Sequence, residues 1–152
     1  MRTQCALNTS YPVLSVFFST NVRTRKDLTV VYSENEKGRM KKMKLWIDDV
    51  RPMPEGYGQH VRSVNKAKEV ILEQEEFYRE LAESCGWEFE IELIDIDHDA
   101  GDYVRDGGDY IKLLDWLEET GRNYPIRIHS MNPVGVMNMR AIIEKNGWTE
   151  VR

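Results

Sequence analysis

After the first 42 residues, short apolar runs alternate along the chain with longer amphipathic stretches. Three runs predict buried strands, at 44–47, 88–96 and 125–128, because each is short and ends in polar residues or a turn. Weaker apolar runs at 60–62 and 148–151 predict two further short strands.

Three stretches have the spacing of amphipathic helices. The first is expected to begin after Ser63, a typical N-cap, and to end at Gly86, with apolar residues on one side and glutamates on the other. The second covers about 108–120, and the third lies between Asn132 and Gly147. Strands that alternate with helices predict a single α/β domain with a mostly parallel sheet of about five strands.

The charge divides the chain into two parts. Residues 1–42 hold 8 Lys+Arg and 3 Asp+Glu, whereas 43–152 hold 13 and 23. Residues 36–39 can be encoded by an almost pure purine tract, as a bacterial ribosome-binding site is, and two methionines, Met40 and Met43, follow it. We therefore expect 1–42 to be a poorly structured leader, and we hypothesise that translation normally starts at Met40 or Met43.

Composition limits the class of protein. The chain has 152 residues, 41% hydrophobic and 31% charged, which is typical of one globular domain. No apolar run approaches the roughly 18 residues of a membrane span. Cys5 and Cys85 are too few for a disulfide framework or a zinc knuckle, so a cytoplasmic location is expected. The acidic body lacks the charge that neutralises phosphates, which argues against duplex nucleic acid as a partner.

Polar side chains follow three of the predicted strands. They are Asp48-Asp49, Asp97-His98-Asp99 and His129-Ser130. The carboxyl ends of parallel strands meet at one edge of a sheet, where ligands bind, so we expect these residues to be neighbours. Clustered carboxylates need protons, arginines or a cation to coexist, and among cations their hard oxygen ligands suit Mg²⁺ best, with Mn²⁺ as the second choice. The predicted metal ligands are Asp48, Asp49, Asp97 and Asp99.

The start of the third helix is a candidate phosphate site. A helix N-terminus presents N–H groups and the positive end of a dipole. Gly135 lacks a side chain and would let an anion approach the backbone. A phosphate held there by Ser130, Asn132 and Gly135 would lie beside His129.

Three ordered motifs at these positions carry a resemblance to a known family. Residues 45–52, 96–99 and 128–135 resemble motifs of the cyclic-phosphate processing receiver-like domain family, and the resemblance covers nearly all of 43–152. It implies a flavodoxin-like, three-layer receiver domain. It also implies a ligand that is a cyclic phosphate, either a small nucleotide or an RNA end.

The resemblance also suggests roles for single residues. Asp48 and Asp49 match the metal-binding acid pair of receivers, Asp97 matches the phosphoacceptor, and Ser130 matches the hydroxyl residue after the fourth strand. The lysine that receivers carry after the fifth strand has no match, and a Pro/Gly loop replaces the helix between the first two strands. These departures argue against ordinary phosphorelay signalling.

The histidines suggest a hydrolase. We predict a metal-assisted cyclic phosphodiesterase in which His98 and His129 act as acid and base, in an order left open, while Arg51 adds a positive contact to the phosphate. Asp95, inside a strand, either faces the site or is a satisfied buried acid, and His60 is expected to be structural.

Three alternatives remain open at the level of sequence. The first is a non-catalytic module that senses a nucleotide or phosphate. The second is a Zn²⁺ or Mn²⁺ hydrolase of another class with His98, His129 and Asp97 or Asp99 as ligands. The third is an interaction domain whose acidic edge docks a basic partner, a hypothesis that does not explain the two histidines.

Overall fold

A parallel sheet forms the centre of the structure, a computed structural model that describes residues 40–86 and 88–152. Its strands are β1 (Met40–Ile47), β2 (Gln59–Val61), β3 (Glu88–Ile96) and β4 (Ile126–Ile128), in the order β2-β1-β3-β4. The α/β fold with a parallel sheet is confirmed. The described residues form four strands rather than about five, because 148–151 contribute only an isolated bridge from Glu150 to Ile126.

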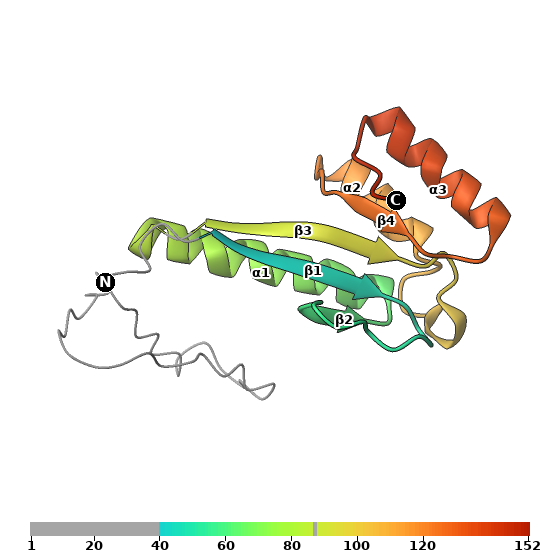
Figure 1. Cartoon of the computed structure of the whole chain (residues 1–152), viewed down its shortest axis with the longest axis horizontal. Coiled ribbons are helices and arrows are strands. Elements are labelled where there is room, and N and C mark those ends of the chain that lie inside the picture. Colours follow the sequence, from blue (N-terminus) through green and yellow to red (C-terminus); the bar gives the residue numbers. More distant parts are fainter. Residues whose placement is uncertain (1–39, 87) are drawn as a thin grey trace.

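Three α-helices complete the domain: α1 (Val64–Cys85), α2 (Ile111–Glu119) and α3 (Pro133–Asn146). A short 3₁₀ helix, η3 (Gly101–Tyr103), follows β3. Figure 1 shows α1 running along β1 and β3, with α2, α3 and β4 gathered toward the end where these long strands terminate. Both short strands pair with that end, since β2 lies beside Leu45–Ile47 and β4 beside Ile94–Ile96.

The hydrophobic core lies between one face of the sheet and the helices. Its buried members include residues of β1, β3 and all three α-helices: Leu45, Ile47, Val70, Ile71, Ile94, Ile96, Leu113, Leu117, Met139 and Ile143. Alternation along the strands turns Trp46 and its register partner Asp95 to the opposite face. That face carries the polar groups of the site.

Local hydrogen bonds set the ends of two helices where the sequence predicted them. The Ser63 hydroxyl accepts from the Lys66 N–H at 3.2 Å, and Gly86 closes α1 at a φ of 70°. The Asn132 side chain caps α3 in the same way. Helix α2 begins three residues later than expected, since Gly108 has a φ of 90° that a helix does not permit.

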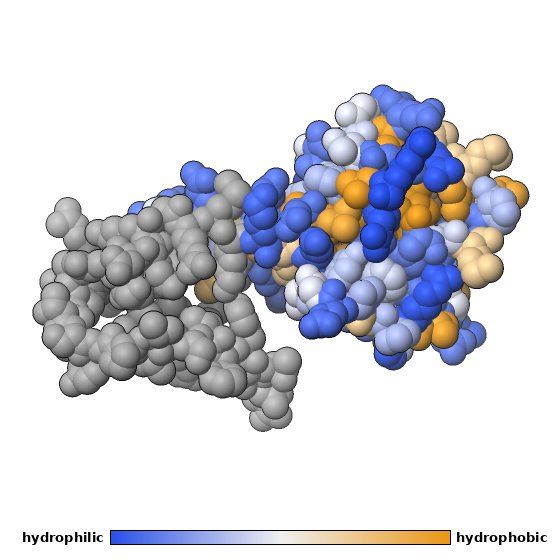
Figure 2. All heavy atoms as spheres, in the orientation of Figure 1, coloured by the Kyte–Doolittle hydropathy of each residue, from blue (hydrophilic) through white to orange (hydrophobic). Residues whose placement is uncertain are grey.

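Most of the predicted leader, residues 1–39, lies outside the described residues. Strand β1 already begins at Met40, before the expected boundary at residue 43. No helix in 40–86 or 88–152 combines the length and apolar character needed to cross a bilayer. In the view of Figure 2 the surface of the described part is mixed, with hydrophilic side chains in the majority.

Candidate functional site

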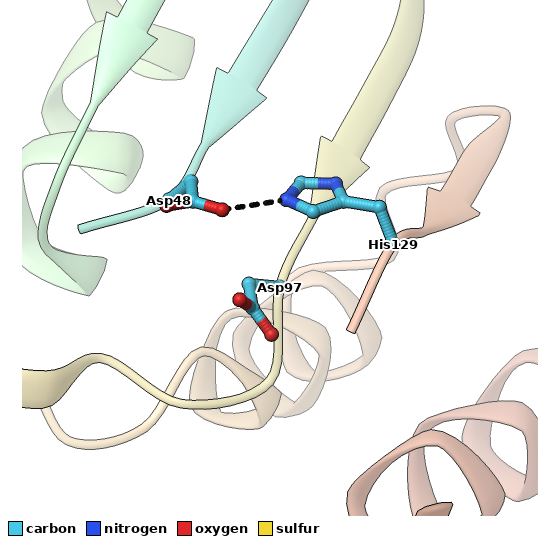
Figure 3. Close-up of side chains that lie close together, drawn as sticks. All are labelled: Asp48, Asp97 and His129. Atoms are coloured by element: carbon cyan, nitrogen blue, oxygen red, sulfur yellow. Dashed lines mark hydrogen bonds and ion pairs between the residues drawn. The ribbon is translucent and has the colours of Figure 1, made fainter. Parts of the chain in front are cut away.

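Three side chains from three strand ends meet at the carboxyl edge of the sheet. Asp48 follows β1, Asp97 follows β3 and His129 follows β4, and one ligand atom from each lies within 4.8 Å of the others (Figure 3). Asp48 is 1% exposed and Asp97 9%. The parallel sheet therefore brings together the strand ends that the sequence singled out.

Asp48 is held by both of its oxygens. Oδ1 accepts from the backbone N–H of Val50 at 2.8 Å and from that of Arg51, so the carboxylate closes the turn after β1. Oδ2 lies 3.0 Å from Nε2 of His129, the contact dashed in Figure 3. Burial raises the pKa of Asp48, but the bonds from Arg51, Val50 and His129 outweigh it and hold the pKa below its usual value.

Arg51 reaches into the middle of this cluster. Its Nη1 atom lies 3.3 Å from Oδ2 of Asp48 and 3.2 Å from Oδ2 of Asp97. The same atom is 3.0 Å from the carbonyl oxygen of His129. The guanidinium thus bridges the two carboxylates, while 38% of the side chain stays exposed and open to a ligand.

His129 is oriented by contacts on its edges and its face. Its Nδ1 lies 2.6 Å from Oδ1 of Asp95, and its ring stacks on the Trp46 indole with centroids 4.0 Å apart and planes 3° apart. Its other nitrogen faces Asp48. Both nitrogens can donate to these carboxylates together only when both carry a proton, as in an imidazolium.

Asp95 is completely buried. Its partners show whether it faces the site or is a satisfied buried acid, which the sequence left open. Besides His129 it binds the guanidinium of Arg127 and the hydroxyl of Tyr57. Burial raises the pKa of Asp95, but the bonds from His129, Arg127 and Tyr57 together hold it below its usual value. Burial and the bond to Asp95 raise the pKa of Tyr57 to about 12. Asp95 both faces the site and is a satisfied buried acid.

Tyr57 and Arg127 are members of this network that the sequence analysis missed. Arg127 stands between two isoleucines of β4, and this alternation was the one signal that could have placed it on the polar face. Tyr57 lies in the Pro/Gly loop, and its hydroxyl accepts from Nη2 of Arg127 at 2.7 Å. No local pattern indicates that contact.

His98 belongs to a second cluster, at the start of α3. Its Nδ1 lies 2.8 Å from Oδ1 of Asp99, and the Asn132 amide donates to the same carboxylate oxygen at 3.1 Å. The bond from His98 lowers the pKa of Asp99, with help from Asn132 and against the effect of burial. A Cβ atom added to Gly135 would lie 2.3 Å from Cγ of His98. The space that Gly135 leaves is therefore filled by the His98 ring rather than kept open for an anion.

The remaining predicted residues lie around these clusters. The Asp49 carboxylate packs against η3, since a Cβ on Gly101 would be 2.0 Å from its Oδ2. The Ser130 hydroxyl accepts from the Asn132 N–H at 3.2 Å, which places it in the turn before α3. His60 lies in β2 with its Nε2 2.9 Å from the carbonyl oxygen of Asp48.

The fit of a divalent metal can be judged from the donor set. Within 40–86 and 88–152, the one group spaced to hold a metal is Asp48, Asp97 and His129, so no group contains both histidines of the zinc alternative. Magnesium prefers oxygen ligands, and here the carboxylate oxygens already face the cation of Arg51 and a ring nitrogen of His129. In this arrangement the two carboxylates suit the guanidinium of Arg51 better than Mg²⁺. The magnesium site stays a prediction.

Comparisons with known proteins address the resemblance. The family model of the cyclic-phosphate processing receiver domain matches residues 43–145, which is more than half of the chain and includes all three motifs. Comparisons with curated proteins and with solved structures found no match. The family match and the parallel α/β fold agree, and the chain belongs to the cyclic-phosphate processing receiver domain family.

Proposed function

We propose that this domain hydrolyses a cyclic phosphodiester. The observation that carries the proposal is that His98 and His129 follow two neighbouring strands, β3 and β4, at one edge of the sheet, and that each imidazole is held by a carboxylate, Asp99 for His98 and Asp95 for His129. Family membership supports a cyclic phosphate as the ligand class. The carrier that we propose for it is a small nucleotide or an RNA end.

The chemistry requires one proton acceptor and one proton donor. Water attacks phosphorus, one P–O bond of the ring breaks, and the leaving oxygen takes up a proton to give a phosphomonoester. His98 suits the base, because its Nδ1 is oriented by Asp99 and its Nε2 can accept a proton from the water. His129 suits the acid, because Asp95 orients its ring through Nδ1 and its Nε2 lies at the carboxylate of Asp48, where the strand ends meet.

Positive charge for the phosphoryl oxygens has a source within the chain. The partly exposed guanidinium of Arg51 can bind them, and the positive end of the α3 dipole lies nearby. The first turn of α3 offers fewer free N–H groups to a phosphate than expected. The Gly135 N–H already donates to the Asn132 side chain at 3.0 Å, and the Val136 N–H donates to the Asn132 carbonyl oxygen. None of these steps needs a metal ion.

One observation favours a second candidate, a module that binds a cyclic phosphate without turning it over. The charges of Asp48, Asp97 and Arg51 are already paired with one another, so they form a stable site before any ligand arrives. Such a module would bind the ligand and release it unchanged.

A substrate screen of the purified full chain tests both candidates. The substrates are a 2′,3′-cyclic nucleotide or RNA end, an ADP-ribose cyclic phosphate and a 3′,5′-cyclic nucleotide, with products read by mass spectrometry. The proposal expects a phosphomonoester from at least one class, and its loss in both His98→Ala and His129→Ala but not in His60→Gln. Wild-type hydrolysis in both alanine variants rules out the histidine mechanism, and calorimetric binding without product establishes the sensor.

A further inference from the structure

The surroundings of the Arg51 guanidinium are those that a bound cation would have. Three oxygens from three separate strand ends surround Nη1: Oδ2 of Asp48 at 3.3 Å, Oδ2 of Asp97 at 3.2 Å and the carbonyl oxygen of His129 at 3.0 Å. Two carboxylates and a carbonyl are hard oxygen donors, the set that Mg²⁺ takes in proteins. We propose that Arg51 is the built-in cation of this site and that it excludes divalent metal from it.

The backbone holds Arg51 in this place. The Asp48 side chain accepts from its N–H, and the Trp46 indole N–H donates to its carbonyl oxygen at 3.3 Å. Pro52 follows and restricts the backbone conformation at Arg51. Because both backbone groups are bonded, the Arg51 main chain is held beside Asp48, and the guanidinium is then held by its contacts with Asp48, Asp97 and the His129 carbonyl.

Electrostatics then disfavour a second cation. Asp48 is 1% exposed and Asp97 9%, so the two carboxylates are poorly screened by water from the guanidinium that they contact. Arginine keeps its charge at every accessible pH. A divalent ion on the same two carboxylates would sit against that charge, so metal binding requires Arg51 to leave.

The inference concerns the site itself and holds whether or not the proposed hydrolysis takes place. Replacing Arg51 by a neutral residue tests the inference directly. Without the guanidinium, Asp48, Asp97 and the His129 carbonyl form an acidic pocket that lacks a cation. The Arg51→Ala variant should therefore acquire a divalent metal site that the wild type lacks.

The test measures metal binding directly, by Mn²⁺ electron paramagnetic resonance and by the shift of Tm on adding Mg²⁺ or Mn²⁺. We expect the wild type to show no Tm shift, and Arg51→Ala to bind Mn²⁺ at least about tenfold more tightly than the wild type does. Arg51→Lys keeps a positive charge and should not gain the site. Arg62→Ala, which removes an exposed arginine, is the matched control and should behave as the wild type.

Two results overturn the inference. One is tight Mn²⁺ or Mg²⁺ binding by the wild type, a measurement that stands even where Arg51→Ala fails to fold. The other is a folded Arg51→Ala variant, verified by circular dichroism, whose metal affinity equals that of the wild type. Failure of the proposed function is a separate outcome, since a chain that turns over no cyclic phosphate still gives a metal titration. Hydrolysis by the wild type that survives chelator supports both proposals together.

Discussion

His129 is joined to Asp95 across two neighbouring strands, with 2.6 Å between Nδ1 of the ring and Oδ1 of the carboxylate. Asp95 is fully buried inside β3, so the imidazole takes its orientation from the sheet rather than from a mobile loop. The stacked Trp46 ring fixes the plane of the imidazole, and Asp95 fixes its rotation within that plane. Asp95 is therefore a positioning residue for His129.

Asp95→Asn tests this positioning role. The amide keeps the shape of the carboxylate but loses its charge, and Arg127, Tyr57 and His129 then compete for a single acceptor oxygen. We expect a loss of about 1–3 kcal/mol in the free energy of unfolding, measured with urea. We also expect a changed tautomer population of His129, read from ¹⁵N NMR of the imidazole, and slower turnover of any cyclic phosphate that the domain cleaves.

Asp115→Asn is the matched control, because Asp115 pairs with Lys112 on an exposed surface at 2.8 Å. Its effect on unfolding should stay within about 0.5 kcal/mol. A purely structural role for Asp95 would lower stability and leave the ¹⁵N signals of His129 unchanged. That pair of results would contradict the positioning role.

A second prediction concerns acid stability and a network far from the site. Glu75 of α1 accepts from Nε of Arg122 at 3.0 Å and from Nη2 at 2.8 Å, and it also binds the Tyr124 hydroxyl. Burial raises the pKa of Glu75, but Arg122 and Tyr124 outweigh it and hold the pKa below its usual value of 4.5. A lowered pKa in the folded state means stability that is present above about pH 4.5 and is lost as the pH falls through the folded pKa.

Glu75→Gln should therefore cost stability near neutral pH and much less in acid. The measurement is the free energy of unfolding of both proteins at about pH 7 and about pH 3. The difference between them should shrink at the lower pH, where the wild-type carboxyl is also protonated. Glu73→Gln, on an exposed position of the same helix, should show no such trend. An equal deficit at both pH values would mean that the charge of Glu75 contributes nothing.

The parts of the fold that depend on neighbours in sequence were predictable. Ser63 and Asn132 cap their helices through bonds that span three residues, and Gly86 ends α1 by its own left-handed backbone. The meeting of Asp48 with Asp97 followed from one rule, that parallel strands end at a common edge. Local chemistry and topology were sufficient for these features.

The partners of Asp95 could not be predicted, because they depend on long-range register. Arg127 reaches Asp95 since Ile94 pairs with Ile126 across the sheet, and a shift of one residue would turn Arg127 to the core. Tyr57 arrives from a loop whose path is set only once β1 and β2 have paired. The role of Gly135, which is to leave space for the His98 ring, could not be predicted either, because His98 is distant from it in sequence.

Gly135→Ala is the third prediction. The new Cβ would lie within 2.7 Å of three ring atoms of His98, so the imidazole must shift, which disturbs its contact with Asp99. Alanine favours a helix by up to about 1 kcal/mol over glycine, and we expect the clash to cancel that gain in urea unfolding. Turnover of any cyclic phosphate that the domain cleaves should fall, and the NMR signals of the His98 ring should shift. Val134→Ala, exposed in the same turn, should leave both unchanged.

The fourth prediction separates two roles of the Asn132 side chain, the cap of α3 and the contact with Asp99. Its oxygen caps α3 by accepting from the Gly135 N–H, and its nitrogen donates to Asp99 at 3.1 Å. Asn132→Ala loses both bonds and should cost about 1 kcal/mol of stability, the usual value of a helix cap. Asn132→Ser keeps an oxygen acceptor at the cap and loses only the bond to Asp99, so its cost should be smaller.

Asn132→Asp distinguishes capping from the contact with Asp99. An aspartate is as good a cap as asparagine and suits the positive end of the α3 dipole, so capping alone predicts a variant at least as stable as the wild type. The contact with Asp99 predicts the opposite, because a donor amide is replaced by a carboxylate facing another carboxylate. We expect Asn132→Asp to be less stable than the wild type at low salt, with a deficit that narrows as added salt screens the repulsion. A variant that equals or exceeds wild-type stability at low salt would mean that Asn132 serves the helix only.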